Sequence, residues 1–350
     1  ATAEVRIDGN TDLVGRNRPE IPTTITGVVG RYQTFLQLLP RFMADLPGNT
    51  PYESGGSDIP YNQTLDIATW NMEFFGTTIS GYGPSDVTLQ ASNAATVLSA
   101  LNADIIAVQE VSDDVLLQSI VDGMTNYQLV CSDVYSYSFE EPDPNNPFPA
   151  QKLCYIYDTS VANLVSERAV FDEFYTQARL GEITDLDDYP TSSGASSFWS
   201  SGRLPYQLIA DVTVMGTTKR INLINLHAKS GSSSSDLTRR AYDLAVLKDS
   251  LDADYSADAV VILGDYNDNV TTSIGGGPST YEVILNDTDN FDAITRSLSE
   301  SFTPTYIGGS GSTIDHITIS NELFEDVIEG SEAIYFPFNS IENYEGTTSD

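Results

Sequence analysis

Short apolar runs that end in polar groups recur along this chain. The range 260–263 holds four β-branched or leucine residues in a row, which predicts a short buried strand. Gly264 then allows a turn or a close approach of the backbone. The range 265–269 holds two carboxylates and two amides. Because a buried carboxylate is costly unless it is paired, hydrogen-bonded or bound to a metal, this strand end indicates a site.

The same form appears four more times. We predict strands at Leu65–Trp70, which leads to Asn71 and Glu73, at Ala103–Glu110, at Ile221–His227 and within Ser312–Ser320, which contains Asp315. Each strand carries a polar or acidic side chain at its end or in its middle. Five such strands predict one site at which these side chains meet.

A calcium-binding loop is one alternative for the polar range after Gly264. Asp265, Asn267 and Asn269 match positions 1, 3 and 5 of an EF-hand loop. Position 6 should be glycine and is Val270, and position 12 should be glutamate and is Gly276, so we exclude this motif. A strand followed by an Asp/Asn turn, which is a common arrangement, stays as the other alternative.

The order of the polar fragments carries a family resemblance. They are Trp70-Asn71-Met72-Glu73, Gln109-Glu110, Leu226-His227, Gly264-Asp265-Tyr266-Asn267 and Ile314-Asp315-His316. Together they resemble the endonuclease/exonuclease/phosphatase family, which includes the DNase I-like nucleases. The resemblance covers roughly residues 63–350, and five fragments in one order make it specific. It implies an α+β fold, namely a four-layer α/β/β/α sandwich of two mixed sheets flanked by helices.

Apolar spacing predicts two helices that each precede a strand of the site. Asp86 is the candidate N-cap of the first, whose apolar face is Ala94, Val97, Leu98 and Leu101. Asp236 is the candidate N-cap of the second, whose apolar face is Leu237, Ala241, Leu244, Leu247 and Leu251. Further strands are predicted at 153–157 and 207–214, and loops at 191–197 and 231–235.

The N-terminal residues have a different pattern. Strand-like runs at 3–7, 23–32 and 34–40 weakly resemble the end of a small β-barrel of the OB type. A range rich in Pro, Gly, Ser and Asn follows. We therefore expect a partial OB-like β module at 1–50, a linker at 51–62, and the family's domain at 63–350, cut short at its C-terminus.

Charge supports a boundary near residue 50. The chain has 50 acidic and 16 basic residues, for a formal charge of −34, yet residues 1–50 hold five of each sign. Such acidity argues against general electrostatic affinity for nucleic acid, although a metal and a few arginines can hold phosphate locally. We interpret most of the charge as a solvated surface. No apolar run approaches the length of a membrane span.

Two cysteines, Cys131 and Cys154, flank a loop rich in Pro and Asn. A disulfide between them is reasonable if the flanking segments pair as strands, and two buried free thiols are the alternative. The few lysines and the acidity favour an exported protein, in which disulfides persist. The N-terminus lacks both Met and a signal peptide, so we interpret it as a mature terminus or a cut end. We expect a secreted or extracytoplasmic protein.

The resemblance implies a metal site built from oxygen ligands. Glu110 matches the family's principal ligand, with Asn71 and Glu73 beside it, and Asp350 is expected to join the set. Oxygen ligands suit a hard divalent cation, Mg²⁺ first, with Mn²⁺ or Ca²⁺ as alternatives. The cation would neutralise a phosphate oxygen and stabilise the leaving oxygen. The alternative for Glu110 is an exposed glutamate at a strand end.

The resemblance also implies catalytic roles, which fall on His227, Asp265, Asn267 and Asp315. Asp265 would orient and deprotonate the attacking water. His227 would donate a hydrogen bond to the scissile phosphate. A strand-end turn and a structural histidine are the alternatives for these two residues.

Phosphate contacts are expected from four side chains, Asn71, Arg203, His227 and Asn267. Arg203 lies in Gly202–Pro205, which resembles the family's arginine-proline element. Its guanidinium would bind phosphate through two parallel hydrogen bonds. A surface arginine without a role in the site is the alternative.

Asp315 matches the aspartate that orients a catalytic histidine in the family. That histidine follows a Ser-Asp pair, here Ser349-Asp350, and this sequence stops one residue short of it. His316 points to the opposite face if its strand is regular, so we assign it to stability and not to catalysis.

These observations predict an exported, monomeric, metal-dependent phosphodiesterase of the nuclease type, which acts on DNA or RNA by water attack on phosphorus. A phospholipid or inositol phosphate is the alternative substrate for the same site. A catalytically inactive binding module is the third hypothesis, since the last histidine is absent and a β module precedes the domain.

Overall fold

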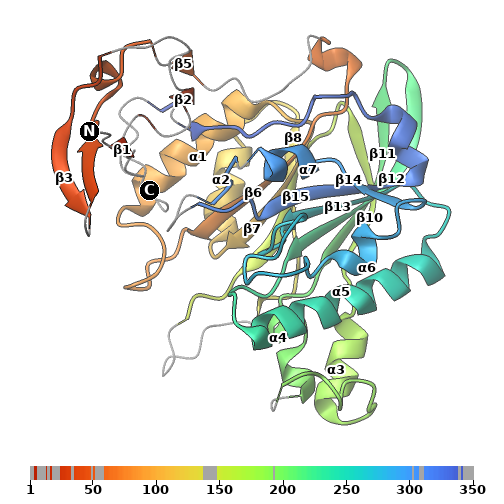
Figure 1. The fold of residues 1–350 in the computed structure, drawn as a ribbon. Coiled ribbons are helices and arrows are strands. Elements are labelled where there is room, and N and C mark those ends of the chain that lie inside the picture. Colours follow the sequence, from red (N-terminus) through yellow and green to blue (C-terminus); the bar gives the residue numbers. More distant parts are fainter. Residues whose placement is uncertain are drawn as a thin grey trace.

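Two β-sheets lie face to face at the centre of the computed structural model (Figure 1). The structure describes residues 4–5, 13, 16–17, 24–32, 35–48, 50–51, 59–136, 148–191, 194–301, 303–306, 311–337 and 340–341. Within this part of the chain, one sheet has the strand order β6-β7-β9-β8 and the other has β10-β11-β12-β13-β15-β14. Both are mixed, because β6–β7 and β12–β13 pair in parallel while β7–β9 and β13–β15 pair antiparallel.

The strand bounds follow the apolar runs of the sequence. The first sheet consists of β6 (Ile67–Phe75), β7 (Ile105–Val111), β8 (Tyr127–Cys131) and β9 (Lys152–Asp158). The second consists of β10 (Ala162–Ala169), β11 (Tyr206–Val214), β12 (Thr217–His227), β13 (Val260–Asp265), β14 (Phe291–Ala293) and β15 (Asp315–Ser320). The seven strands predicted in this part of the sequence are all present, and β8, β10 and β14 are additional.

Alternating side chains divide the core into three layers. Ile105 and Ala107 of β7 pack between the two sheets, while Ile106 and Val108 pack against α1 (Val87–Leu101) and α2 (Asp114–Val121). On the far side, the second sheet packs against α3 (Asp172–Leu180), α4 (Phe198–Gly202), α5 (Ser234–Asp254) and α6 (Glu282–Leu285). Another short helix, α7 (Arg296–Glu300), follows β14. The predicted four-layer α/β/β/α sandwich is therefore confirmed.

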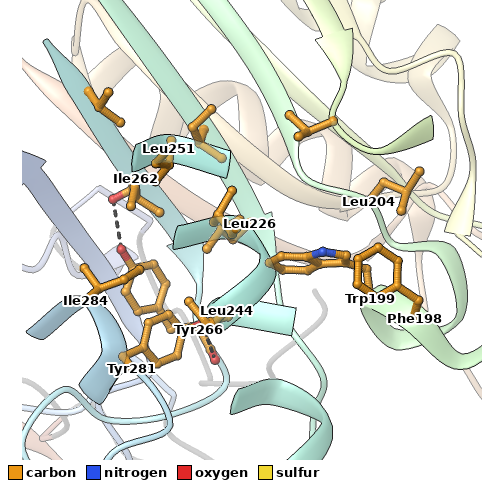
Figure 2. Close-up of a cluster of buried hydrophobic side chains, with 14 of the residues drawn as sticks. Phe198, Trp199, Leu204, Leu226, Leu244, Leu251, Ile262, Tyr266, Tyr281 and Ile284 are labelled. Atoms are coloured by element: carbon orange, nitrogen blue, oxygen red, sulfur yellow. Dashed lines mark hydrogen bonds between the residues drawn. The ribbon is translucent and has the colours of Figure 1, made fainter. Parts of the chain in front are cut away.

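Figure 2 shows the core beneath the second sheet. The rings of Tyr266 and Tyr281 stack with centroids 4.2 Å apart. The Tyr266 hydroxyl donates to the Ile262 carbonyl at 3.0 Å, and the Tyr281 hydroxyl donates to the Tyr266 carbonyl at 3.0 Å. These bonds allow two phenols to lie in an apolar core, because a buried hydroxyl needs a partner. They also anchor the chain immediately after Asp265.

Helix starts confirm one predicted cap and correct the other. The Asp86 side chain accepts from the amides of Thr88 and Leu89, so Asp86 is the N-cap of α1. For α5 the prediction of Asp236 was wrong, because Ser233 is the N-cap and Asp236 is the third helical residue. The two side chains form a capping box, which satisfies two amides at once. The predicted loop 231–235 therefore ends earlier, since α5 begins at Ser234.

Among the residues described before the two large sheets, five short strands are present: β1 (Glu4–Val5), β2 (Arg16–Asn17), β3 (Val28–Tyr32), β4 (Phe35–Leu39) and β5 (Thr50–Pro51). They form separate small sheets in the orders β1-β4-β3 and β2-β5. The pair β2–β5 places Pro51, the first residue of the expected linker, opposite Arg16. The OB-like resemblance of this region stays a prediction.

None of the helices in the described residues combines the length and apolarity that a membrane span requires.

Cys131 and Cys154 form the expected disulfide. They lie opposite each other in the antiparallel pair β8–β9, with their Cα atoms 4.0 Å apart. The bridge thus closes the loop that joins these two strands, which contains the range 137–147 outside the described residues.

Removal of this bridge should lower stability. A Cys131→Ala/Cys154→Ala variant should lose roughly 3 kcal/mol of unfolding free energy, because the unfolded chain gains loop entropy. Urea unfolding measures the loss. Dithiothreitol should destabilise the parent protein and leave the variant unchanged, and equal sensitivity of both proteins would contradict the prediction.

Candidate active site

The predicted site residues meet in one cleft. A cleft of about 1840 Å³ is lined by every one of them that the structure describes, namely Asn71, Glu73, Glu110, Arg203, His227, Asp265, Asn267 and Asp315. Asp350 lies outside the described residues, so its expected place among the metal ligands stays a prediction.

Strand register explains the convergence. His227 and Asp265 end the parallel strands β12 and β13 and lie opposite each other. Asp315 begins the antiparallel strand β15 on the other side of Asp265. In the first sheet, Asn71 of β6 lies opposite Gln109 of β7, so Glu110 follows at the same edge. Carboxyl ends of parallel strands from both sheets therefore share one edge of the sandwich.

Three of these residues form a close group. Glu110, His227 and Asp265 each offer one ligand atom, and these atoms lie within 4.8 Å of one another. His227 Nε2 is 3.4 Å from Glu110 Oε1 and 3.7 Å from Asp265 Oδ2. Asn71 joins the two carboxylates, since its Nδ2 donates to Glu110 Oε1 at 3.0 Å and to Asp265 Oδ2 at 2.9 Å.

The second oxygen of Glu110 has its own donors. Glu110 Oε2 accepts from the Phe74 amide and from Gln151 Nε2, each at 3.1 Å. Gln151 is buried, and nothing in its sequence context marked it as part of the site.

Glu73, Phe74 and Glu110 all have left-handed backbones, with φ of 46°, 54° and 58°. Non-glycine residues in this region are strained and concentrate at functional sites.

Asn267 orients Asp265. Its amide donates to Asp265 Oδ1 at 2.8 Å, and its Nδ2 donates to Asp265 Oδ2 at 3.2 Å and to the Ala228 carbonyl at 3.1 Å. The backbone of Asn267 is also left-handed, with φ of 50°. Its donors are thus engaged within the protein, and the expected phosphate contact of Asn267 stays a prediction.

Arg203 lies against the ring of His227. Its Nη1 is 3.0 Å from His227 Nδ1 and 2.5 Å from His227 Nε2. Burial, reinforced by this guanidinium, lowers the pKa of His227 well below its usual value, so the imidazole is neutral. Only a neutral ring can accept from a guanidinium, which carries donors alone.

The carboxylates of the cleft resist ionisation. Burial raises the pKa of Glu110 to about 7, with the charges of Asp265 and Glu73 adding to the shift, while Asn71 and Arg203 oppose it. Burial also raises the pKa of Asp265. For Asp315, burial and the neighbouring Asp265 charge raise the pKa to about 8.

These residues fit a divalent cation. Carboxylate oxygens from two sheets face one small volume, and burial raises the pKa of both Glu110 and Asp265, because the charged forms lose hydration there. A hard cation prefers such oxygens and would replace the bound protons. Asn71 presents its nitrogen to both carboxylates, and Glu73 lies outside the close group, so ligand roles for these two stay predictions.

Asp315 has an unused acceptor. Its Oδ1 is shielded from solvent and receives no hydrogen bond from the described residues, while its amide donates to Thr305 Oγ1. This arrangement suits a hydrogen-bond donor placed at that oxygen. His316 lies apart from the cleft, as predicted, with Nδ1 3.0 Å from Thr295 Oγ1 and Nε2 3.2 Å from the Thr313 carbonyl.

Asp268 does not belong to the site, although it lies close in sequence. Its carboxylate accepts from Ile274 and Thr280 and lies 3.5 Å from Arg240 Nη2, and both charged side chains are fully buried. Burial alone would raise the pKa of Asp268, but the Thr280 hydrogen bonds and Arg240 hold it below its usual value. Asp268 therefore supports the loop after β13.

A polar bridge connects the sheets beneath the site. Gln109 Nε2 donates to Asn225 Oδ1 at 2.8 Å, and Asn225 Nδ2 donates to the carbonyls of Val108 and Cys154 at 3.1 Å. Gln109 immediately precedes Glu110, and Asn225 lies two residues before His227. The bridge therefore fixes the relative position of two groups that come from different sheets.

Metal-free protein should lose stability as pH rises. Glu110 and Asp315 have folded pKa values of about 7 and about 8, above their unfolded values. In the unfolded chain these carboxyl groups have pKa values of about 4, so the folded state binds their protons more tightly. The resulting contribution to the unfolding free energy is complete below about pH 4 and is lost as pH rises through the folded pKa values of about 7 and about 8. Urea unfolding in EDTA between pH 5 and 9 measures the decline, which should be shallower in Glu110→Gln. Mg²⁺ should stabilise the parent protein more at high pH, and a decline of equal slope in both proteins would contradict the assignment.

Solved structures that this chain resembles include three distant ones. A humanized D. rerio TDP2 is 14% identical with a TM-score of 0.45, and the match covers 73% of this chain and 83% of that one. The human Nocturnin catalytic domain is 12% identical with a TM-score of 0.47, covering 76% and 85%. A Bacteroides thetaiotaomicron mannosyl-6-phosphatase is 11% identical with a TM-score of 0.44, covering 74% and 86%.

Sequence comparison identifies the family. Comparison with curated proteins found no match. The model of the Endonuclease/Exonuclease/phosphatase family, in contrast, matches residues 68–333. This range spans both large sheets and contains every predicted site residue that lines the cleft. The match extends over more than half of the chain and agrees with the sandwich and with the resemblance found in the sequence. The chain therefore belongs to the Endonuclease/Exonuclease/phosphatase family.

Proposed function

We propose that this protein is a divalent-cation-dependent phosphodiesterase of the nuclease type, which hydrolyses DNA or RNA by attack of water on phosphorus. The observation that carries the proposal is the convergence of Glu110, Asp265 and a neutral His227, with Arg203 against the ring, in one cleft. Carboxylates suit the cation, while the guanidinium and imidazole suit a phosphate.

The side chains divide into two sets. Glu110, with the oxygens of Asp265 beside it, would hold the cation, which would neutralise charge on the phosphate when bound. Mg²⁺ is our first choice, with Mn²⁺ or Ca²⁺ as alternatives. Asp265 is held by Asn267 through two hydrogen bonds and has a raised pKa, so it suits the acceptance of a proton from water.

The second set faces the phosphate. A neutral His227 has one acceptor nitrogen, which would face Arg203, and one N–H, which would donate to a phosphate oxygen. Arg203 offers a fixed positive charge next to that ring. The two groups together would stabilise the charge that develops on phosphorus oxygens during water attack.

We further propose that the protein acts outside the cytoplasm as a monomer. The Cys131–Cys154 disulfide supports export, since such bridges persist in oxidising compartments. The strongly acidic composition suits a solvated surface.

Substrate turnover is the direct test. Plasmid DNA, RNA, sphingomyelin and inositol phosphates should be compared with Mg²⁺ and with EDTA. We expect cleavage of a nucleic acid that EDTA abolishes. Cleavage of a lipid or inositol phosphate alone would move the substrate to the second hypothesis, and no turnover of any of them would favour a binding module.

Glu110→Gln should weaken cation binding. The change removes a charge from the close group and keeps the shape of the side chain, so the affinity for Mg²⁺ or Mn²⁺ should fall markedly in calorimetry. Glu329→Gln is a matched control, because Glu329 is exposed. Equal affinities in both variants would remove Glu110 from the ligand set.

The two histidines should separate activity from stability. His227→Ala should lower kcat by roughly 10²–10³ through lost stabilisation of the transition state. His316→Ala should lower the Tm instead, since that ring is buried and hydrogen-bonded away from the cleft. The opposite ranking in turnover and thermal melts would show that the site is misplaced.

A further inference from the structure

The segment that delivers Arg203 to the cleft is α4, and most of its backbone is not that of a right-handed helix. Trp199, Ser200 and Ser201 are all left-handed, with φ and ψ of 43° and 58°, 53° and 40°, and 69° and 42°. Gly202 continues the turn with φ of 96°. Side chains with a Cβ adopt this conformation at a cost, and they do so singly as a rule. Three in a row therefore require a surrounding structure that holds them.

Asp243 of α5 supplies that support. The Trp199 amide donates to Asp243 Oδ1 at 3.2 Å, and the Tyr189 hydroxyl donates to the same oxygen at 2.9 Å. The turn then closes on itself, because the Arg203 amide donates to the Trp199 carbonyl at 2.7 Å. A buried carboxyl group on a helix thus fixes the first residue of the turn and, through it, the last.

The Trp199 ring anchors the same point in the core. It is fully buried and lies beside Phe198, with ring centroids 6.3 Å apart, and Figure 2 shows Leu226 on the side of Trp199 and Leu204 on the side of Phe198. Before the turn, Arg239 Nη2 donates to the Ser197 carbonyl at 2.7 Å. Residues of α5 therefore hold the turn at two places, and its far end carries Arg203.

The turn ends at the guanidinium in the cleft. Arg203 Nη2 donates to the hydroxyl of Ser200, a residue of the turn, and Nη1 lies against the His227 ring. The left-handed turn thus fixes both the backbone and the side chain of Arg203.

Burial of the Asp243 carboxyl group costs folding free energy, so a role in stability alone does not explain this residue. Its Oδ2 is buried and accepts no hydrogen bond from the described residues. Burial raises the pKa of the Asp243 carboxyl to about 8, against the effect of its hydrogen bonds. Oδ1, in contrast, is engaged by two donors, one of which is the amide of the strained turn.

We propose that Asp243 is a positioning residue, which holds the left-handed turn 199–202 and thereby places the Arg203 guanidinium against His227 in the phosphate site. The inference rests on the proposed function for the role of Arg203. It predicts that the effect of Asp243 on turnover passes through Arg203 alone.

A double-mutant cycle tests this coupling. Turnover of bis(p-nitrophenyl) phosphate with Mg²⁺ is measured for Asp243→Leu, which removes the acceptor, and for Asp243→Asn, which keeps it. We expect Asp243→Leu to lower kcat/KM by roughly 10²-fold, since a small displacement of a binding group has such effects. Asp243→Asn should retain most of the activity. In an Arg203→Ala background, Asp243→Leu should cost no further activity.

Two controls separate positioning from stability. Asp249→Leu changes an exposed aspartate on the same helix and should leave turnover unchanged. Mg²⁺ affinity should be equal in Asp243→Leu and the parent protein, because the turn carries no cation ligand. Should the leucine variant fail to fold, Asp243→Ala removes the same acceptor without overfilling the site. A loss of equal size with and without Arg203 would overturn the proposal.

Amide exchange gives a readout that does not need activity. The amides of 199–203 should exchange faster in Asp243→Leu than in the parent protein or in Asp243→Asn. Unchanged exchange in the leucine variant would overturn the role of Asp243. A parent protein that turns over no phosphodiester would instead refute the proposed function, and the exchange experiment would still decide whether Asp243 holds the turn.

Discussion

Several carboxylates buried beside one another are the constraint on which this structure depends. Glu110, Asp265 and Asp315 would repel strongly in a poorly hydrated cleft, and the fold offsets only part of that cost. Asn71 places one amide between two of them, and backbone amides satisfy further oxygens. Phe74 and Asn267, whose amides donate to Glu110 and Asp265, both have left-handed backbones. The strained backbone at the strand ends therefore serves to supply donors to the carboxylates. The remaining imbalance is what makes the cleft suited to a cation.

Such a site tolerates little displacement, which explains the polar contacts found deep in the sandwich. The Gln109–Asn225 bridge fixes β7 relative to β12, and the buried Asp268–Arg240 pair fixes the loop after β13. Neither contact reaches the cleft. The bridge joins two strands that lead to Glu110 and His227, and the ion pair holds the loop that contains Asn267, so their contribution is to geometry as much as to stability. The four layers of this fold thus hold a few strand ends, which carry the site residues, in fixed relative positions.

The sequence predicted the strands and their convergence because both follow from local pattern. Apolar runs predicted β6, β7, β12, β13 and β15, and a polar residue at one end of each of these strands lines the cleft. Residues whose role depends on distant partners were not predicted from the sequence. Gln151 is one of them, since its side chain donates to Glu110 from just before β9, another strand of the first sheet. Asp243 escaped for the same reason, since a helical aspartate is usually solvated and the partner here is an amide 44 residues away. Ser233 was missed although its spacing to Asp236 is a recognisable capping box.

The positions of the tryptophans have a practical consequence. The chain has two, Trp70 and Trp199. Trp70 lines the cleft and precedes Asn71, while Trp199 starts the turn that ends at Arg203. The Trp70 side chain packs against the core under α1 and α2, on the strand that carries Asn71, and the Trp199 side chain packs in the core behind Arg203. The protein carries its own fluorescent reporters, and replacing either tryptophan with phenylalanine would let the remaining emission follow one of these two regions without any attached dye.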